Sequence, residues 1–457
     1  MGARIVIMNP PFTNRTKMGE KFPDEVQNAL RQRVDALESG LIRNDPELEG
    51  VASKTAIAPL FEMLADRVAD TANGVVAMIR PTIVCSGPSN EQIRRVLAKR
   101  FHIHTLLTCH CPGNVNLSQN TAINESLIVM QRHGGGETPA TRIVALDRFP
   151  GDEAAMSELY EALHRTESGR LPEGWGEVSR WPAKWTEVGD WTAGVFRAPA
   201  LAEAAYEIAH SSTLIPMEEQ EMVPSAVLMG GQIAQYKRHV QPDALGAFPV
   251  FYSKSADVQR KIRGAPDEHW APRREVRREQ WVDLPDADDS LHPDTARVMR
   301  HAAHLLVTAG QDTGTGRLTS VVRDEPSLGL GWLPVPGIML EQARAASVFL
   351  NSTAGRLQLM RNPGMKLAFP QYNPAGLKTI RLPDLSDKGT VERLTRYWET
   401  TADEEVPQYR DGECEARRIW DDAVSDTLGW DKEWLAELRQ WLHREPHVRG
   451  LGYNQFG

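Results

Sequence analysis

The chain has 457 residues, 41% of them hydrophobic and 25% charged, which is enough for two or three globular domains of ordinary composition. The net charge of −9 does not mark the whole chain as a nucleic-acid binder, so the distribution of charge matters more than its sum. No apolar run reaches the length of a membrane span, and the N-terminus lacks a signal-peptide pattern. Four cysteines in so long a chain argue against a disulfide framework. These features predict a cytoplasmic protein.

The N-terminal segment combines a short apolar strand with a rigid turn. Ile5–Met8 is predicted to form a short apolar strand, and Asn9, Pro10, Pro11 and Phe12 follow it directly. Two consecutive prolines fix φ and remove two backbone donors, so the carbonyl groups of the turn can accept hydrogen bonds from a ligand. An aromatic ring after them offers a face on which a base can stack. A proline-rich loop that only ends an edge strand is the alternative interpretation.

Helical and extended patterns alternate after this turn. The apolar spacing predicts a helix over residues 55–72, through Ile57, Leu60, Phe61, Leu64 and Val68. Further runs predict strands at 75–79, 103–107, 126–130 and 142–146, a helix around 93–97, a loop at 81–88 and a hairpin turn at 134–136. This alternation indicates a layered α/β sheet.

Three further motifs follow the Asn-Pro-Pro-Phe turn. They read P-x-x-x-x-S-G-x-S (Pro81, Ser86, Gly87, Ser89), R-x-x-L (Arg94, Leu97) and N-T-x-x-x-E-x-L-x-V (Asn120, Thr121, Glu125, Leu127, Val129). Together, over residues 1–147, they resemble the second half of the Rossmann-like domain of N6-adenine DNA methyltransferases in type I and type IIG restriction-modification systems. The resemblance implies that Asn9 and Pro10 hold the target amine, that Phe12 stacks on a flipped base, and that Pro11 sets the turn.

The same resemblance implies S-adenosyl-L-methionine as the methyl donor. In that family a strand and a glycine-rich loop precede the Asn-Pro-Pro-Phe strand, and the sequence here begins at that strand. Neither Gly134–Gly136 nor Gln311–Gly316 is a substitute, because a cofactor loop must follow an apolar strand and open a helix. We therefore expect a partner chain to supply the cofactor half, and we expect Ile5–Met8 to be an exposed sheet edge.

The rest of the chain predicts a connecting segment, a recognition domain and a helical tail. Residues 151–220 combine an amphipathic helix with Trp175, Trp181, Trp185 and Trp191, which we interpret as core residues. Residues 221–385 predict an α+β domain, with a long helix at 340–359 that contains L-N-S-x-x-G and a strand at 377–382. This region resembles the DNA target-recognition domain of the same enzymes, and residues 386–457 resemble their helical tail. The catalytic half then spans residues 1–150.

Basic residues suggest where double-stranded DNA is contacted. Residues 251–280 carry eight basic and five acidic groups, whereas residues 1–150 have a net charge of +2 and residues 388–457 one of −5. We predict phosphate contacts from the following side chains: Arg260, Lys261, Arg263, Arg273, Arg274, Arg277 and Arg278. A solvated charged surface is the equally weighted alternative.

Several alternatives remain open at this point. The spacing of His102, His104, Cys109, His110 and Cys111 lacks the geometry of a zinc site, so no metal is predicted. Cytosine N4 is a weaker target than adenine N6, and methylation of RNA or protein is a further enzymatic reading. The alternative outside the enzymes is a catalytically incomplete DNA-binding or modulatory subunit without its own cofactor site.

Overall fold

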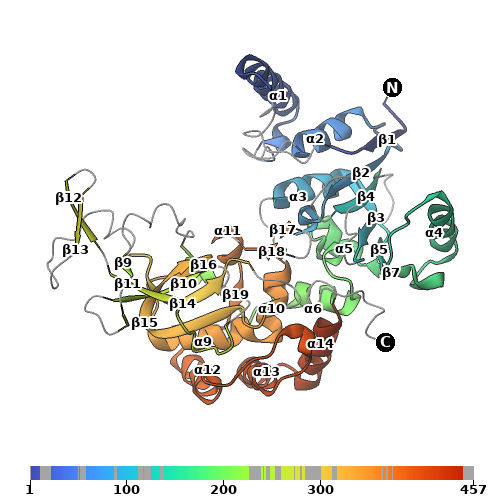
Figure 1. Cartoon of the computed structure of the whole chain (residues 1–457). Coiled ribbons are helices and arrows are strands. Elements are labelled where there is room, and N and C mark those ends of the chain that lie inside the picture. Colours follow the sequence, from blue (N-terminus) through green and yellow to red (C-terminus); the bar gives the residue numbers. More distant parts are fainter. Residues whose placement is uncertain are drawn as a thin grey trace. The chain divides into compact units, whose positions relative to one another are not determined.

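A computed structural model of the chain describes residues 2–10, 22–49, 51, 58–86, 90–111, 117, 125–133, 138–225, 238–239, 241–242, 247–252, 259–271, 273–277, 280–283, 300–310, 316–361, 364–366, 369–372 and 374–445. The chain divides into two compact units (Figure 1). Unit 1 comprises Met1–Ala202, Met365–Leu367 and Leu451–Gly457, and unit 2 comprises Glu203–Gly364 and Ala368–Gly450.

A twisted sheet forms the centre of unit 1, and its described strands follow the order β1-β2-β4-β3-β5-β7-β6. The strands are β1 (Ile5–Met8), β2 (Val75–Pro81), β3 (Phe101–Cys109), β4 (Glu125–Arg132), β5 (Thr141–Leu146), β6 (Gly169–Leu171) and β7 (Gly176–Trp181). Strands β1, β2, β3 and β5 run in one direction, because β1 pairs parallel with β2, β3 pairs parallel with β5, and β4 is antiparallel to both β2 and β3. The mixed α/β fold class predicted from the sequence is confirmed.

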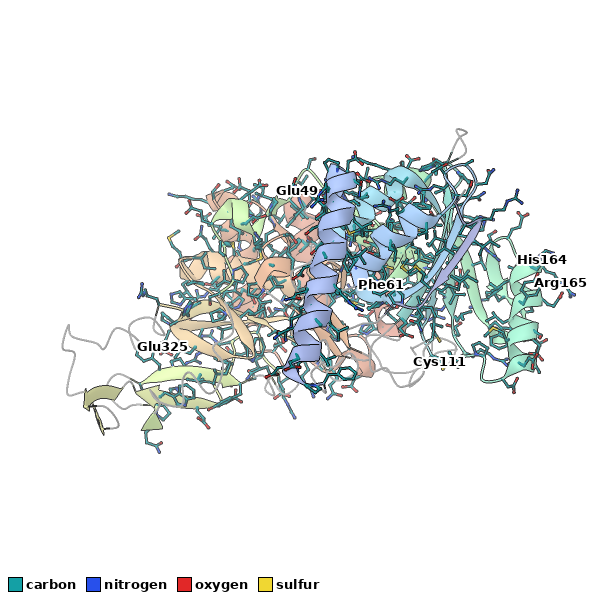
Figure 2. The ribbon with its side chains drawn as sticks, turned by 90° about the horizontal axis from the view of Figure 1, so that it is seen from above. Glu49, Phe61, Cys111, His164, Arg165 and Glu325 are labelled. Carbon is teal, nitrogen blue, oxygen red and sulfur yellow. The ribbon has the colours of Figure 1, made fainter. Side chains whose placement is uncertain are left out.

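The helices of unit 1 lie between these strands in the chain. They are α1 (Asp24–Asn44), α2 (Ala58–Val68), α3 (Glu91–Arg100), α4 (Glu153–Arg165) and α5 (Ala183–Glu187), and α6 (Pro199–His210) continues into unit 2. Figure 2 shows α1 as one long helix, and only Leu41 of its 21 residues is buried. The same view shows His164 and Arg165 at the end of α4.

The residues that α2 buries are not all among the apolar positions that predicted it. Glu62 and Asp66 are buried on this helix, whereas Phe61 and Leu64 are half-buried and Val68 is 41% exposed. The apolar spacing thus predicted the presence of the helix correctly, but α2 ends at Val68 and not at residue 72, and residues 55–57 lie outside the described part of the chain. The burial of two carboxylates requires paired cations, because an unpaired buried charge is strongly unfavourable.

Two other expectations for unit 1 have a clear outcome. Trp175, Trp181 and Trp191 are at most 2% exposed, which confirms that they are core residues, whereas Trp185 is only half-buried. The hairpin turn expected at 134–136 is wrong, because β4 and β5 are not neighbours: β3 lies between them in the sheet. Those glycines themselves lie outside the described residues. The segment 151–220, expected as a connector, contributes β6 and β7 to the sheet of unit 1.

Unit 2 contains a second sheet with the order β16-β14-β15-β10-β11-β9 among its described strands. These strands are β9 (Arg238–His239), β10 (Phe248–Tyr252), β11 (Glu268–Ala271), β14 (Ala303–Thr308), β15 (Ser320–Leu330) and β16 (Trp332–Val335). A separate hairpin pairs β12 (Arg273–Arg277) with β13 (Gln280–Asp283), and β8 (Ile215–Pro216) pairs with β19 (Arg381–Leu382). Short strands β17 (Gly364–Lys366) and β18 (Phe369–Gln371) follow later in the chain.

The helices of unit 2 are α9 (Leu340–Asn351), α10 (Thr353–Arg361), α11 (Pro374–Leu377), α12 (Lys388–Thr401), α13 (Glu415–Leu428) and α14 (Lys432–Arg444). The single helix expected at 340–359 is broken at Ser352, whose ψ of 167° is extended. The strand expected at 377–382 is reduced to Arg381–Leu382, and Leu377 ends a short helix instead. The predicted C-terminal helices are confirmed as α13 and α14.

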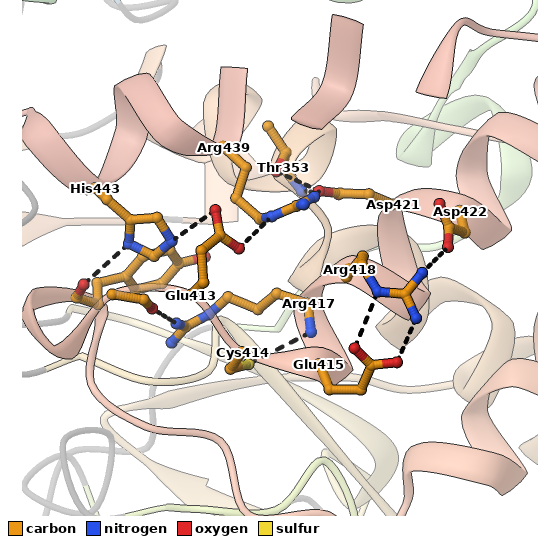
Figure 3. A network of polar contacts seen from close by, with 12 residues as sticks. Thr353, Glu413, Cys414, Glu415, Arg417, Arg418, Asp421, Asp422, Arg439 and His443 are labelled. Atoms are coloured by element: carbon orange, nitrogen blue, oxygen red, sulfur yellow. Dashed lines mark hydrogen bonds and ion pairs between the residues drawn. The ribbon is translucent and has the colours of Figure 1, made fainter. Parts of the chain in front are cut away.

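A buried polar network joins three helices of unit 2 (Figure 3). Asp421 of α13 accepts hydrogen bonds from the Thr353 amide at 2.7 Å and from the Thr353 hydroxyl at 2.8 Å, and so caps the start of α10. Arg439 of α14 pairs with the same carboxylate and also bonds Glu413 at 2.8 Å. Burial raises the pKa of Asp421 to about 6, although Arg439 and Thr353 act in the opposite direction.

Candidate active site

The Asn9–Pro10 turn lies at the carboxyl end of β1, at the edge of the sheet where the parallel strands β2, β3 and β5 also end. Asn9 is exposed and Pro10 is buried. In open sheets of parallel strands, ligands bind in the crevice outside these carboxyl ends. Pro11 and Phe12 lie outside the described residues.

Strand β1 is the outermost strand of the described sheet. It pairs with β2 from Ile5 opposite Val75 to Met8 opposite Met78. Ile5 is 67% and Ile7 80% exposed on one face, while Val6 and Met8 are only half-buried on the other. A continuous apolar run is typical of a parallel strand covered on both faces, so β1 has the sequence of an interior strand in an edge position.

A buried ion pair lies at the carboxyl end of β2. Arg80 pairs with Glu62 of α2, and the side chains are 4% and 1% exposed. Burial lowers the pKa of Arg80 to about 9, so the guanidinium stays protonated at neutral pH. The pair was not predicted from the sequence, where its signals are an arginine near the end of an apolar strand and a glutamate on the preceding helix.

Small polar side chains surround the same end of the sheet. Ser126 of β4, directly opposite Arg80, donates a hydrogen bond to Thr82 at 2.9 Å. Cys85 lies 3.9 Å from the Ser126 hydroxyl. Burial raises the pKa of Cys85 to about 11, so the group is a neutral thiol and not a nucleophile. The edge is therefore polar but has no activated nucleophile among these three residues.

Arg94 fixes the loop that follows β2. Its Nε donates to the Gly189 carbonyl at 2.7 Å, and its Nη1 donates to the Val84 and Ser86 carbonyls at 3.0 Å each. Arg94 is the arginine of the R-x-x-L motif, and Ser86 begins the Ser-Gly-x-Ser motif. The two motifs are thus joined through one buried guanidinium, and residues 87–89 lie outside the described part of the chain.

A second buried ion pair lies at the end of β5. Arg197 makes a bidentate contact with Asp147, at 2.5 Å from Nε to Oδ1 and at 2.8 Å from Nη2 to Oδ2. Its Nη1 also donates to Glu177 at 3.1 Å. The bidentate geometry fixes the segment after β6 and β7 to the end of β5, which is a structural role.

The residues predicted to contact DNA fall into two groups in unit 2. Arg260 pairs with Glu405 at 3.6 Å, and Arg263 pairs with Asp324 and Asp403 at 3.4 Å each. Lys261 is half-buried. Because carboxylates already neutralise Arg260 and Arg263, contacts from these two to phosphate would require an exchange of partners.

The second group lies on the β12–β13 hairpin. Arg273, Arg274 and Arg277 belong to β12, and the register places Arg273 opposite Asp283 and Arg277 opposite Gln280. Arg278 lies outside the described residues. Hairpin strands offer a way to present alternate side chains to a groove of DNA.

The described residues offer neither a metal site nor a membrane-spanning helix. No group of three or more His, Cys, Asp or Glu side chains in the described ranges is arranged to hold a metal ion. No helix within those ranges has both the length and the apolar character needed to cross a membrane.

Comparisons with known proteins give structural neighbours only. No protein-family model matches the sequence, and no curated protein sequence matches it. Solved structures that match include the type IIG restriction endonuclease BpuSI (12% identity, 99% of this chain and 54% of that one, TM-score 0.40) and the type IIL restriction-modification enzyme MmeI in complex with DNA (11%, 99% and 55%, TM-score 0.46). A type I methyltransferase subunit from Streptococcus thermophilus matches at 17% identity over 42% of this chain and 37% of that one, with a TM-score of 0.30. The chain spans about half the length of the first two structures.

Proposed function

We propose that this chain supplies the catalytic turn and the target-recognition part of an S-adenosylmethionine-dependent methyltransferase that modifies adenine N6 in double-stranded DNA. The observation that carries the proposal is the position of Asn9–Pro10. This turn has the sequence of an amine-holding loop, and it follows a parallel strand at the edge where such sheets bind ligands.

The chemistry needs a group that makes a poor nucleophile react. The lone pair of an exocyclic amine is delocalised into the base, and the Asn9 side-chain oxygen and the Pro10 carbonyl can both accept hydrogen bonds from that amine. These two bonds localise the lone pair on nitrogen and orient it. Positioning and electrostatic stabilisation carry the reaction, so no strong base is required, and the amine proton can pass to water. Phe12 would stack on the flipped base, and Pro11 would set the turn.

We propose that another segment holds most of the cofactor, S-adenosyl-L-methionine, and that this chain contributes only one side of its site. S-adenosyl-L-methionine supplies the electrophilic methyl group when it is bound. The exposed, apolar β1 can accept a further parallel strand, and the half-buried Phe61 and Leu64 of α2 leave apolar surface in the same unit. We propose that a partner chain adds the cofactor-binding half beside β1.

The recognition part is proposed to lie in unit 2. The β12–β13 hairpin is the favoured contact, because Arg260 and Arg263 are already paired with carboxylates. The acidic groups around those two arginines make the local surface a poor site for phosphate.

Methyl transfer by the native complex tests the proposal. The tagged full-length chain is isolated from its own cells with whatever binds it, then incubated with duplex DNA and S-adenosylmethionine carrying a labelled methyl group. We expect label on adenine N6 after digestion to nucleosides. Label on cytosine, RNA or protein would contradict the proposal. DNA binding without any methyl transfer would favour the modulatory-subunit alternative.

A further inference from the structure

Helix α2 carries two buried carboxylates one turn apart, and they are paired at opposite edges of the sheet. Glu62 pairs with Arg80 at the carboxyl end of β2. Asp66 pairs with Arg100 at 2.5 Å, just before β3, and with Arg132 at 2.7 Å, at the end of the antiparallel β4. Both latter positions lie at the amino ends of the parallel strands. The helix is thus linked to both edges by ion pairs.

The two sets of ion pairs differ in burial. Side chains in the Asp66 set are 11–16% exposed, whereas those of Glu62 and Arg80 are at most 4% exposed. Each set, within the described part of the chain, keeps polar atoms without a hydrogen-bond partner: Arg80 Nε and Glu62 Oε2 in the first and Arg132 Nε in the second. A buried ion pair with unmet bonding capacity contributes little to stability, because the desolvation of both charges offsets their attraction. Stability alone therefore does not explain why the pair is present.

Extension of the β1–β2 register beyond its last pair would bring this ion pair next to the candidate catalytic turn. Met8 lies opposite Met78 in the parallel β1–β2 ladder, and Arg80 is two residues beyond Met78 on the same face. Pro10 is likewise two residues beyond Met8. Continued by two residues, the register brings Pro10 beside Arg80. Pro10 is buried although the neighbouring Asn9 is exposed.

We propose that the Glu62–Arg80 pair is a positioning device, in which Glu62 orients the Arg80 guanidinium and Arg80 holds the Asn9–Pro10 turn in the geometry needed for an amine substrate. This inference rests on the proposed function of the turn. A displacement of about 1 Å at such a turn would reduce the rate about a hundredfold without altering contacts elsewhere on DNA.

The test uses a double variant that removes both charges together. Glu62→Gln with Arg80→Met keeps similar volumes and leaves no unpaired charge, so the protein should fold. Asp66→Asn with Arg132→Met is the matched control, because it likewise removes both charges of a pair on the same helix, at the far edge of the sheet, while Arg100 keeps Asp45 and Glu47. Arg80→Lys retains the charge without the planar fork and should give an intermediate effect.

Amide hydrogen exchange over Ile5–Asn9 in the purified full-length chain is the first readout, and it needs no enzymatic activity. We expect about tenfold faster exchange in the Glu62–Arg80 double variant and wild-type exchange in the Asp66–Arg132 control. Unchanged exchange in the double variant would overturn the proposal. Equal acceleration in both variants would also overturn it, since that would show a general loss of unit 1 stability.

The second readout is steady-state methyl transfer by the native complex. The double variant should lower kcat about a hundredfold and leave the KM for DNA close to wild type. An unchanged kcat, or a change in KM alone, contradicts a positioning role. A wild-type complex that methylates no DNA refutes the proposed function, and the exchange result then decides by itself whether the pair positions the turn.

Discussion

The Asn351 side chain at the end of α9 is bonded to the backbone of Thr319, which directly precedes β15. Asn351 Oδ1 accepts a hydrogen bond from the Thr319 amide at 2.8 Å, and Nδ2 donates to the carbonyls of Ser320 at 3.0 Å and Ser347 at 2.9 Å. All four residues are buried. The asparagine of the L-N-S-x-x-G motif therefore joins a helix to the central sheet of unit 2.

Replacement of Asn351 by leucine should destabilise unit 2 strongly. The substitution leaves several buried donors and acceptors without partners, each worth about 1–3 kcal/mol, so we expect a loss of at least about 3 kcal/mol. Urea unfolding of the full-length chain measures it. Ser347→Ala, which removes one hydroxyl from the same network, should cost only about 1 kcal/mol. Equal losses for the two variants would show that the Asn351 contacts are not special.

The hairpin arginines should control the salt dependence of DNA binding. Changing Arg273, Arg274, Arg277 and Arg278 together to glutamine should reduce the slope of log K against log salt by about 3 to 4, because each lost phosphate contact removes about 0.9. Fluorescence anisotropy with a short duplex across a salt series gives the slope. Arg260→Gln with Arg263→Gln is the control and should change it much less. A larger change in slope for the Arg260–Arg263 variant than for the hairpin variant would show that the main DNA contact does not lie on the hairpin.

Asp421 should make the stability of unit 2 fall as pH rises from 4 to 6. Its pKa is raised to about 6 in the folded state, chiefly by burial, so the folded chain binds more protons than the unfolded chain between these values. Stability from this group is fully present below the unfolded pKa and is lost as pH passes the folded pKa. The total is on the order of 2–3 kcal/mol.

The comparison with Asp421→Asn isolates this titration from the other carboxyl groups. Unfolding free energies of both proteins are measured from pH 4 to pH 7. The free energy of unfolding of the wild type should fall relative to that of the variant as pH rises over that interval. The difference should become constant above about pH 7. A difference that is constant throughout, or that shifts in favour of the wild type, contradicts the assignment.

The isolated chain should bind S-adenosylmethionine weakly or not at all. Strand β1 is the outermost strand of the described sheet and exposes Ile7 at 80% on one face, so we expect one wall of the crevice to come from another segment. Isothermal calorimetry of the purified chain, alone and in its native complex, gives the two affinities. Clear stoichiometric binding by the monomer would show that no partner is needed for the cofactor.

The order of elements in unit 1 was predictable, but the side chains that complete the site were not. The apolar runs located β1, β2, β3, β4 and β5, because buried strands have continuous or alternating apolar patterns. Periodicity gave no sign that α2 turns Glu62 and Asp66 toward the sheet, since their partners Arg80, Arg100 and Arg132 meet them only in space.

The break in the helix expected at residues 340–359 of unit 2 could not be predicted from the local sequence either. The pattern through residues 340–359 predicted one helix because every position on it is compatible with helix. The break at Ser352 depends on Asp421, nearly 70 residues later, which bonds the amide of Thr353 and so satisfies the start of a new helix. A helix cap that comes from a distant helix leaves no signal in the sequence around the break.

Removal of the Asn9 side chain tests the central claim most directly. Methyl transfer and DNA affinity of the native complex are measured side by side for wild type, Asn9→Ala and the control Asn73→Ala, an exposed asparagine before β2. We predict that Asn9→Ala lowers kcat by about a hundredfold or more while DNA affinity stays close to wild type, because the amine contacts act mainly in the transition state. Wild-type methyl transfer by Asn9→Ala would contradict the assignment of this turn as the catalytic site.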